Sequence, residues 1–386
     1  MKFNQKAKFL EPSATKQFKS VIKQLNQSGV SVIDFGHGDT DMSISPSLKK
    51  DLVLRLSNPS IYKYGETKGV EIIRQMIASK HHVDPNCIIL NTGAKGCLNM
   101  LMQLLINPNS CLLSFGPFWN TYKIQTELAG GSIIKYDFDD HGRINFETLA
   151  EVLHTNSVET IIINNPHNPT GKVFSKVELR MLISLAQELE IQIISDEVYS
   201  EFVFGDQPHI STYAVAKEEG YEESVFVVNS FSKNYGLSGF RIGYVIANEQ
   251  FIQKATQYVS HTVSNIPEIL QHAAIHEMLQ TKHHSQELCV YSKRHATARK
   301  ILDKCTHLQD RISTGGIYFF PKVINTNITN WNNFAMDLLK EHGVAVIPGS
   351  SFGWDEYFRL SIGKADEESI KKGIMKIDSF LKLYSK

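Results

Sequence analysis

Residues 224–247 read SVFVVNSFSKNYGLSGFRIGYVIA, which is two apolar runs on either side of a loop of small and hydroxyl-bearing residues. The runs 224–229 and 240–247 are rich in β-branched and aromatic residues, which is typical of buried strands. About ten residues separate them, fewer than the dozen or more that a parallel crossover needs. We therefore expect the second of these strands to run antiparallel to the first.

Five further strand-like runs precede this stretch: residues 87–91, 111–114, 132–136, 160–164 and 191–195. Between them, residues 95–105 and 176–189 carry apolar side chains at helical spacing. Strands joined through helices are usually parallel and buried on both faces. The pattern predicts an α/β fold with a mostly parallel seven-stranded sheet and one antiparallel strand.

The chain has 386 residues, more than a single hydrophobic core usually organises. We expect a large domain over residues 46–284 and a smaller α+β domain built from residues 1–45 and 285–386. In the second part, the pattern favours a helix, short strands around residues 316–320, 344–347 and 357–361, and a final helix.

The composition is that of an ordinary folded protein, with 42% hydrophobic residues and 40 basic residues balanced by 40 acidic ones. A net charge of zero argues against a nucleic-acid partner. Neither a membrane span nor a signal segment is visible, and we expect a cytoplasmic protein.

Five cysteines, far apart, predict neither a disulfide framework nor a zinc site. The pairs His81-His82 and His283-His284 lie in polar stretches without ligand spacing, so we expect them on the solvated surface and expect no metal.

Lys233 stands in the loop between the last two predicted strands, eight positions before Arg241. Asp196 follows the run 191–195, at the carboxyl end of a strand, where open α/β sheets bind ligands. A lysine Schiff base with an acid on the pyridine nitrogen is the usual way to hold pyridoxal 5′-phosphate (PLP). The alternatives are an exposed loop lysine and an aspartate that only caps a helix.

Two more loops follow predicted strands. Residues 164–171 read NNPHNPTG, a rigid turn that would aim the Asn168 amide, and we predict that the Asn168-Pro169 bond is cis. Residues 91–96 read NTGAKG and lead into a helix, whose first backbone N–H groups would suit a phosphate.

Taken together, NPHNPTG at 165–171, SDEVY at 195–199, and SxSK with RxGY over 230–244 resemble the class I and II aminotransferases of PLP fold type I, the aspartate aminotransferase superfamily. The resemblance extends from Gly36 to Ile362 and therefore covers most of the chain.

The resemblance implies a role for each matching residue. Lys233 would form the Schiff base with PLP and shuttle the proton, Asp196 would pair with the pyridinium nitrogen, and Trp119 would stack on the ring. The ring hydroxyl would contact Asn168 and Tyr199. The phosphate would be held by Gly93, Ala94, Lys95, Ser230, Ser232 and Arg241.

The resemblance also implies a substrate site and a partner. Arg359 would bind the substrate α-carboxylate, with Gly38 and Asn168 beside it. Tyr64 matches a tyrosine that reaches the phosphate of the neighbouring subunit, which implies a homodimer with shared active sites. Packing alone would also explain Trp119 and Tyr64.

Three positions depart from the family pattern. Asp39-Thr40 stands where many relatives carry Glu-Pro, and Lys95 is longer than the usual small residue; we expect both differences to change little. His37, beside Gly38, would either contact the substrate or serve in acid–base chemistry, unless it is only packed or solvated.

We expect an aminotransferase that moves an amino group from an L-amino acid to a 2-oxo acid through a Lys Schiff base and a ketimine. A PLP-dependent lyase or cyclase would use the same residues, whereas Arg359 argues against a decarboxylase. A non-catalytic regulator would need a DNA-binding module, for which the residues before Gly36 are too few.

Overall fold

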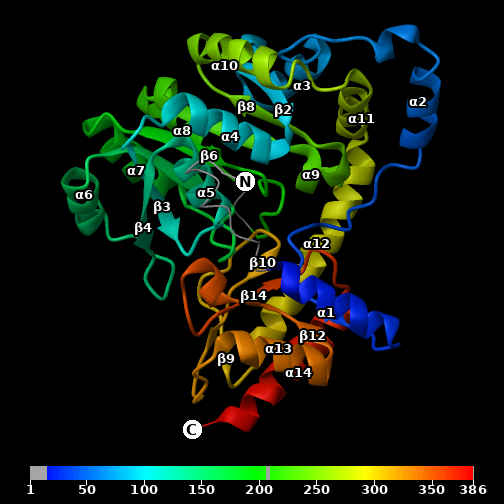
Figure 1. Ribbon diagram of the computed structural model, residues 1–386, viewed down its shortest axis with the longest axis vertical. Coiled ribbons are helices and arrows are strands. Elements are labelled where there is room, and N and C mark those ends of the chain that lie inside the picture. The colour runs from blue at the N-terminus through cyan, green and yellow to red at the C-terminus, as the bar shows by residue number, and fades with distance from the viewer. Residues whose placement is uncertain (1–14, 206–208, 386) are drawn as a thin grey trace, which may run out of the picture.

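The computed structural model describes residues 15–205 and 209–385. A large sheet covered by helices occupies one end of the molecule, and the C-terminal elements gather at the other (Figure 1). The long helix α12 (Thr281–Leu302) runs from the first group to the second. The division into domains at residues 45 and 285 stays a prediction.

The large sheet has seven strands in the order β2-β8-β7-β6-β5-β3-β4. Their bounds are Ile88–Thr92 (β2), Cys111–Gly116 (β3), Ser132–Asp137 (β4), Val158–Asn164 (β5), Gln192–Asp196 (β6), Val225–Ser230 (β7) and Ile242–Ile246 (β8). Strand β8 pairs antiparallel with both β2 and β7, and the other neighbouring pairs are parallel. The predicted fold class and the reversed last strand are confirmed.

Helices cover both faces of this sheet because successive strand residues point to opposite sides. On one face, side chains such as Ile89, Ile162 and Val245 form a core with the helices α4 (Gly93–Leu105), α5 (Thr121–Ala129) and α10 (Glu249–Thr262). The other face packs against α3 (Glu71–His81), α6 (Phe146–Thr155), α7 (Lys176–Glu188), α8 (Thr212–Glu219) and α11 (Glu268–Leu279). Burial on both faces explains why these strands read as continuous apolar runs.

The C-terminal elements surround a separate hydrophobic core. The strands β10 (Tyr318–Phe319), β13 (Ile347–Pro348) and β14 (Phe358–Ser361) form a small sheet, and β12 (Val344–Ala345) pairs with β1 (Ile33–Asp34). The strands β10, β12, β13 and β14 and the final helix α14 (Glu367–Leu381) match the predicted pattern. Elements that we did not predict include β1, α1 (Thr15–Gln27), α2 (Leu48–Arg55), α13 (Trp331–His342), β9 (Leu308–Gln309) and β11 (Lys322–Val323).

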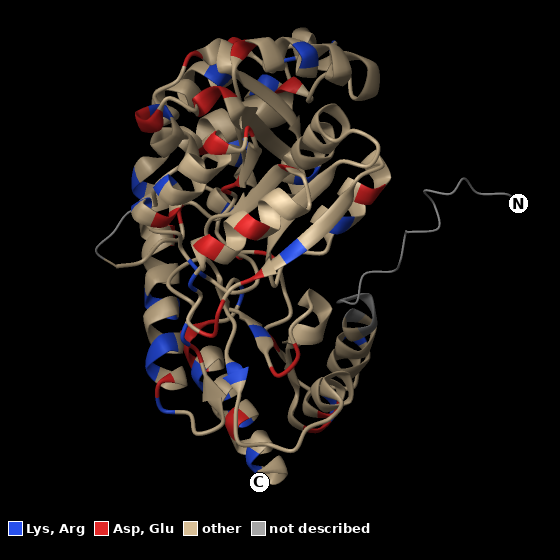
Figure 2. Cartoon of the chain, turned by 90° about the vertical axis from the view of Figure 1, so that its left-hand side faces the viewer, with Lys and Arg blue, Asp and Glu red and all other residues tan. Residues whose placement is uncertain are grey.

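Acidic and basic residues are interspersed over both ends of the molecule (Figure 2). Within the described part of the chain, no helix has the length and apolar character needed to cross a membrane.

The expectation of a solvated surface is wrong for His81 and His284. The Nε2 atom of His81 lies 2.9 Å from the Tyr244 hydroxyl, and burial lowers the pKa of His81 to about 4. The His284 ring stacks on Tyr235 at 4.7 Å. The polar sequence neighbours of these histidines gave no sign of this packing, which brings together residues far apart in the chain.

Gly243 on β8 offers a test of how closely the reversed strand approaches α4. A Cβ atom there would lie 2.5 Å from the Gly93 carbonyl carbon and 2.6 Å from the Ala94 nitrogen, and backbone cannot move aside easily. We expect Gly243→Ala to lower the free energy of unfolding by about 1–3 kcal/mol, the usual cost of overpacking. The matched control is Gly239→Ala, where a Cβ would meet nothing within 4 Å. Equal thermal unfolding midpoints for the two variants would contradict this packing.

Candidate active site

The predicted site residues meet at one edge of the large sheet. The parallel strands β5, β6 and β7 end there at Asn164, Asp196 and Ser230. Because β8 is reversed, its first residues lie at the same edge, where Ile242 pairs with Thr92 and Gly243 pairs with Ser230. Carboxyl ends of parallel strands are where such sheets bind ligands.

Gly93 and Arg241 form the centre of an anion site. Gly93 has φ +69°, and a Cβ atom there would lie 2.7 Å from the Arg241 Nη2 atom, so only glycine admits the guanidinium. Arg241 itself adopts φ +56° and donates from Nη1 to the Ser238 carbonyl at 2.8 Å. Gly93, Ala94 and Lys95 open α4, and the first N–H groups of a helix have no partner within it.

Ser230 and Ser232 lie beside this site at the start of the short helix α9 (Phe231–Asn234). The Ser230 hydroxyl accepts a hydrogen bond from the Ser232 N–H at 3.4 Å and caps the helix. Both side chains are buried, so their hydroxyl groups are held close to the strand end.

Asp196 is a buried carboxylate, only 2% exposed. The Tyr122 hydroxyl donates to its Oδ2 atom at 2.7 Å, and the Val198 N–H reaches Oδ1 at 3.3 Å. Burial raises the pKa of Asp196 to about 6, against the lowering effect of these hydrogen bonds. No cation pairs with it among the described residues. Sequence reasoning missed Tyr122, because nothing in the pattern of α5 points to a distant acid.

Arg359 is a buried cation in the same site as the buried Asp196 carboxylate, and it is 5% exposed. Its Nη1 atom donates to Asn168 Oδ1 at 3.2 Å and its Nη2 atom to the Gly36 carbonyl at 3.0 Å. The buried Nε atom has no hydrogen-bond partner, and within the described chain no carboxylate forms an ion pair with this side chain. The Asn168-Pro169 bond that positions the amide is cis, as predicted.

Tyr318 joins Arg359 to Tyr199. The guanidinium carbon lies 4.6 Å from the centre of the Tyr318 ring, and the two tyrosine hydroxyls are 2.9 Å apart. Gly38 faces the Tyr318 hydroxyl, since a Cβ atom on Gly38 would lie 3.3 Å from that oxygen. We did not predict Tyr318, which lies in one of the expected short strands without any motif of its own.

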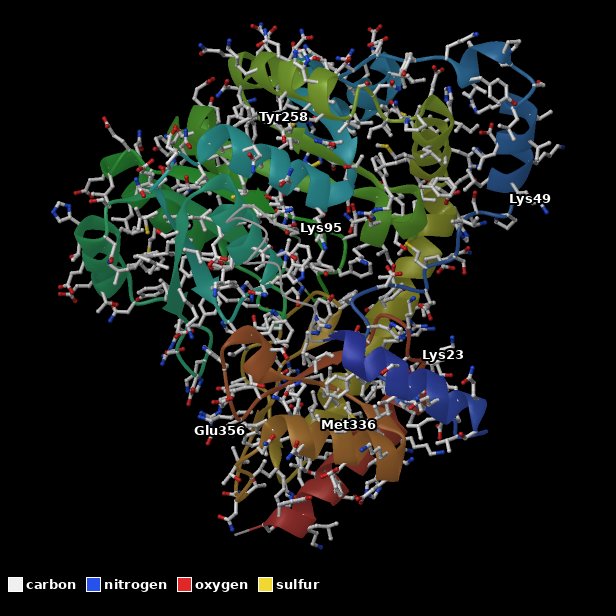
Figure 3. The ribbon with its side chains drawn as sticks, viewed as in Figure 1. Lys23, Lys49, Lys95, Tyr258, Met336 and Glu356 are labelled. Carbon is white, nitrogen blue, oxygen red and sulfur yellow. The ribbon has the colours of Figure 1, made fainter. Side chains whose placement is uncertain are left out.

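Trp119 and Lys95 lie next to each other. The Trp119 ring packs edge-on against Tyr122, 5.6 Å away, and the Lys95 ammonium lies 4.9 Å from the Trp119 ring centre. Lys95 is at the middle of the view in Figure 3, between the large sheet and the C-terminal elements. Burial and the charge of Arg241 lower the pKa of Lys95.

Two of the predicted site residues, His37 and Tyr64, lie apart from the site residues described above. The Nε2 atom of His37 lies 2.8 Å from Asp34 Oδ2, and its side chain is 36% exposed. Tyr64 is 90% exposed and follows the 3-10 helix Pro59–Tyr62, so a single chain does not bring it into the site. Their predicted roles stay predictions.

Lys233 lies on α9 with its amine 2.7 Å from Asp39 Oδ1. Burial lowers the pKa of Lys233; the Asp39 carboxylate opposes this effect, and the charges of Lys364 and Arg241 add to it. Sequence reasoning missed both Asp39 and Lys364. The departure from the family pattern at Asp39 was a signal, but we expected it to change little.

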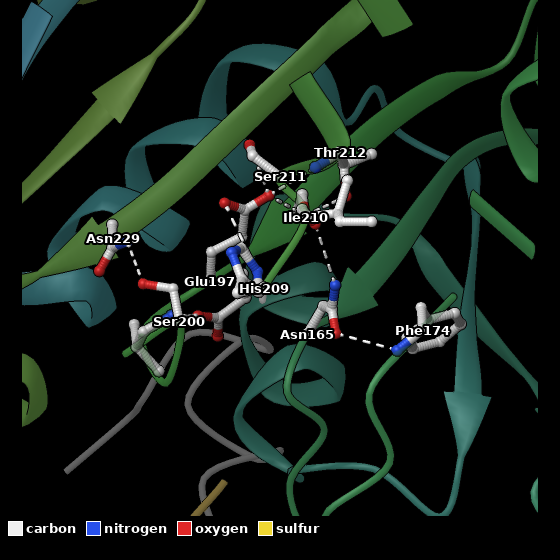
Figure 4. A network of polar contacts seen from close by, with 12 residues as sticks. Asn165, Phe174, Glu197, Ser200, His209, Ile210, Ser211, Thr212 and Asn229 are labelled. Carbon is white, nitrogen blue, oxygen red and sulfur yellow. Dashed lines mark hydrogen bonds and ion pairs between the residues drawn. The ribbon is translucent and has the colours of Figure 1, made fainter. Parts of the chain in front are cut away.

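A network of polar contacts surrounds Glu197, which follows Asp196 in the chain (Figure 4). The fully buried Glu197 accepts hydrogen bonds from Ser195 at 3.1 Å, from Ser211 at 3.0 Å and from the Thr212 N–H at 2.9 Å. These contacts fix the backbone between Asp196 and Tyr199.

Comparisons with known proteins agree with this architecture. The model of the family "Aminotransferase class I and II" matches residues 30–377. The chain is 30% identical to an aspartate aminotransferase of Bacillus sp. (strain YM-2), over 98% of each protein. It is also 30% identical to a probable aspartate/prephenate aminotransferase of Aquifex aeolicus, over 96% of each. The crystal structure of the Thermotoga maritima aspartate aminotransferase superposes with a TM-score of 0.89 at 26% identity, covering 98% of this chain and 100% of that one.

The chain therefore belongs to the class I and II aminotransferase family. It is a PLP-dependent aminotransferase, an enzyme that moves an amino group from an amino acid to a 2-oxo acid. These relatives favour transamination over the elimination and cyclisation alternatives. The residues present fit the cofactor, because a buried acid without a cation and a glycine–arginine anion site lie at the same sheet edge.

Tyr122→Phe tests whether the Tyr122 hydroxyl supports the cofactor through Asp196. The substitution removes a hydrogen bond to a charged group, which contributes about 1.5–3 kcal/mol. We expect the Kd for PLP to rise at least about tenfold, because the loss favours the protonated, neutral form of Asp196. Equilibrium dialysis of the cofactor measures this. Tyr136→Phe, which removes a hydroxyl bonded to the Asn145 carbonyl, is the control. An unchanged Kd in Tyr122→Phe would contradict the role.

Proposed function

We propose that Lys233 carries the cofactor and moves the proton, that Asp196 holds the cofactor ring nitrogen, and that Arg359 holds the substrate α-carboxylate. One observation carries the proposal: the site contains a buried anion and a buried cation that lack charged partners among the described residues, with an amine at the same sheet edge. Burying unpaired charges is costly unless ligands neutralise them. PLP and an amino acid supply the two missing partners.

The cofactor, when bound, supplies an electron sink that makes the Cα–H bond of an amino acid acidic. On this chain, Gly93, Ala94, Lys95, Ser230, Ser232 and Arg241 would hold the phosphate. Trp119 would cover the ring, and Asn168 and Tyr199 would bond the ring hydroxyl. The Tyr318 hydroxyl, 2.9 Å from that of Tyr199, fixes the orientation of Tyr199.

Arg359 would orient the substrate. Hydrogen bonds to Asn168 and the Gly36 carbonyl hold its guanidinium carbon 4.6 Å from the Tyr318 ring centre, so little freedom is lost when a carboxylate binds. Charge-assisted hydrogen bonds to the carboxylate stabilise it against loss as CO2. The proton at Cα then remains as the group that the Lys233 amine removes and returns.

We also propose that the amino donor is an acidic amino acid such as aspartate. The Bacillus and Thermotoga relatives are named aspartate aminotransferases. The Lys95 ammonium adds a positive charge near Trp119 and forms no ion pair in the described part of the chain. A screen of amino donors against 2-oxoglutarate and pyruvate, read by product analysis, tests this. A higher kcat/KM for a neutral donor than for aspartate would overturn it.

Lys233→Ala tests the central role. We expect loss of more than about 1,000-fold in kcat, because both the attachment of the cofactor and a general base disappear. The visible absorbance band of the bound cofactor should also shift, since its covalent bond to the protein is gone. Lys176→Ala, on a partly exposed lysine of α7, is the control. Normal turnover of Lys233→Ala would exclude the assignment.

We propose a homodimer in which Tyr64 acts on the partner's site. The support is a set of exposed apolar side chains on α2, on the segment that follows it and at the start of α3, which we call the α2 patch. It consists of Val53, Leu54, Leu56, Tyr62, Tyr64 and Ile72, with exposed fractions of 45–90%. Large exposed apolar surfaces usually mark interfaces, and the match of Tyr64 to a tyrosine that the family uses between subunits supports a second copy of the chain at this surface. We further propose a cytoplasmic location, where the five free cysteines would stay reduced.

Hybrid dimers test the shared site. Tyr64→Ala and Lys233→Ala are each expected to be weak or inactive as homodimers, but mixing them should restore activity. In a hybrid, one site combines Lys233 of one chain with Tyr64 of the other and is complete. Mixing Lys233→Ala with Asp196→Ala is the control, because every hybrid site then keeps a defect. Failure of the first mixture to gain activity, when light scattering shows dimers and exchange, would contradict the proposal.

A further inference from the structure

Asp39 lies at the centre of a small charged cluster around the Lys233 amine. Its Oδ1 atom is 2.7 Å from Lys233 Nζ. Its Oδ2 atom accepts from the Ser238 hydroxyl at 3.1 Å and lies 3.4 Å from the Lys364 ammonium. One carboxylate therefore faces two lysines that come from distant parts of the chain.

The backbone holds this cluster in place. Asp41 binds Arg294 of α12 through both carboxylate oxygens, at 2.7 and 2.9 Å, and its N–H donates to the Gly363 carbonyl at 3.0 Å. A Cβ atom on Gly363 would clash with the Asp39 carbonyl oxygen. The segments carrying Asp39 and Lys364 are thus clamped side by side, so Asp39 is not a freely moving surface acid.

The signs of the charges define what each residue does. Four charged groups act on one another here: Lys233, Asp39, Lys364 and, through space, Arg241. The Asp39 carboxylate favours the protonated form of the Lys233 nitrogen. Lys364 opposes this, both by partly neutralising Asp39 and by its own positive charge.

We propose that Asp39 is the counter-ion of the Lys233 nitrogen in the cofactor-bound enzyme and that Lys364 weakens the effect of Asp39 on that nitrogen. Together, these two residues set the pH range in which the nitrogen is protonated. Asp39 acts through Lys233 and is a positioning residue. The inference rests on the proposed role of Lys233. It goes beyond that role because it assigns the tuning of the amine to two residues to which the family resemblance gave no role.

The consequence concerns the acid side of the pH profile. Lys233 can remove the substrate proton only when its nitrogen is free of one. Asp39 moves this transition to higher pH, and Lys364 moves it to lower pH. The direction follows from the charges alone and does not depend on which amino acid is bound.

Absorbance titration of the holoenzyme tests the proposal, because the visible band of the bound cofactor reports protonation of the nitrogen attached to it. We expect Asp39→Asn to lower the midpoint by about 1–2 pH units, the usual effect of removing one close opposite charge. We expect Lys364→Gln to raise it by about half a unit, since this side chain is partly exposed. Asp39→Glu, which keeps the charge, should stay within about half a unit of the wild type.

The control variants are Glu341→Gln and Lys340→Gln, which remove the same charges from the exposed surface of α13 and should leave the midpoint unchanged. An unshifted midpoint in Asp39→Asn, or shifts of the same sign in Asp39→Asn and Lys364→Gln, would overturn the inference. Should Asp39→Asn fail to fold, an unchanged or lowered midpoint in Lys364→Gln would overturn it equally. Lys233→Ala separates the two proposals: a band that still titrates in that variant disproves the attachment of the cofactor to Lys233.

Discussion

The antiparallel strand β8, inserted between β2 and β7, is the constraint on which the site depends. In a purely parallel sheet, a residue that precedes a strand lies at the edge opposite to the ligand site. Reversal places Arg241 beside Gly93 and the end of β7. The approach is so close that glycine is required at both Gly93 and Gly243. Core packing and the proposed phosphate site thus depend on the same backbone contact.

The two buried charges show how the site is prepared for its ligands. Asp196 keeps a neutral hydrogen-bond donor in Tyr122, and Arg359 keeps neutral acceptors in Asn168 and the Gly36 carbonyl. These contacts orient both groups without neutralising them. In the proposed roles of these two residues, binding of the cofactor and the substrate would relieve the desolvation cost of each charge, and ligands that bind only the folded state also stabilise it.

Much of the site could be read from the sequence because its motifs sit where strands end. Lys233, Asp196, Asn168 and Arg241 were singled out in this way, and Arg359 was assigned through the family resemblance. Tyr122, Tyr318 and Lys364 were not, since each reaches the site from an element whose local pattern is ordinary. Asp39 was noted only as a departure from the family pattern that we expected to change little. A hydrogen bond such as Tyr122 to Asp196 depends on the packing of α5 against the sheet, and no spacing in the chain encodes it.

By itself, the sequence determined the class of fold, the reversal of the last strand, the cis Asn168-Pro169 bond and the family, because these follow from hydrophobic periodicity, connection length and short motifs. Only the tertiary structure decided which side chains surround the Lys233 amine. Asp39 and Lys364 are more than 300 residues apart and meet through the clamp of Asp41, Arg294 and Gly363. Electrostatic interactions act through space, so their strength is set by distances and burial that exist only after the chain has folded.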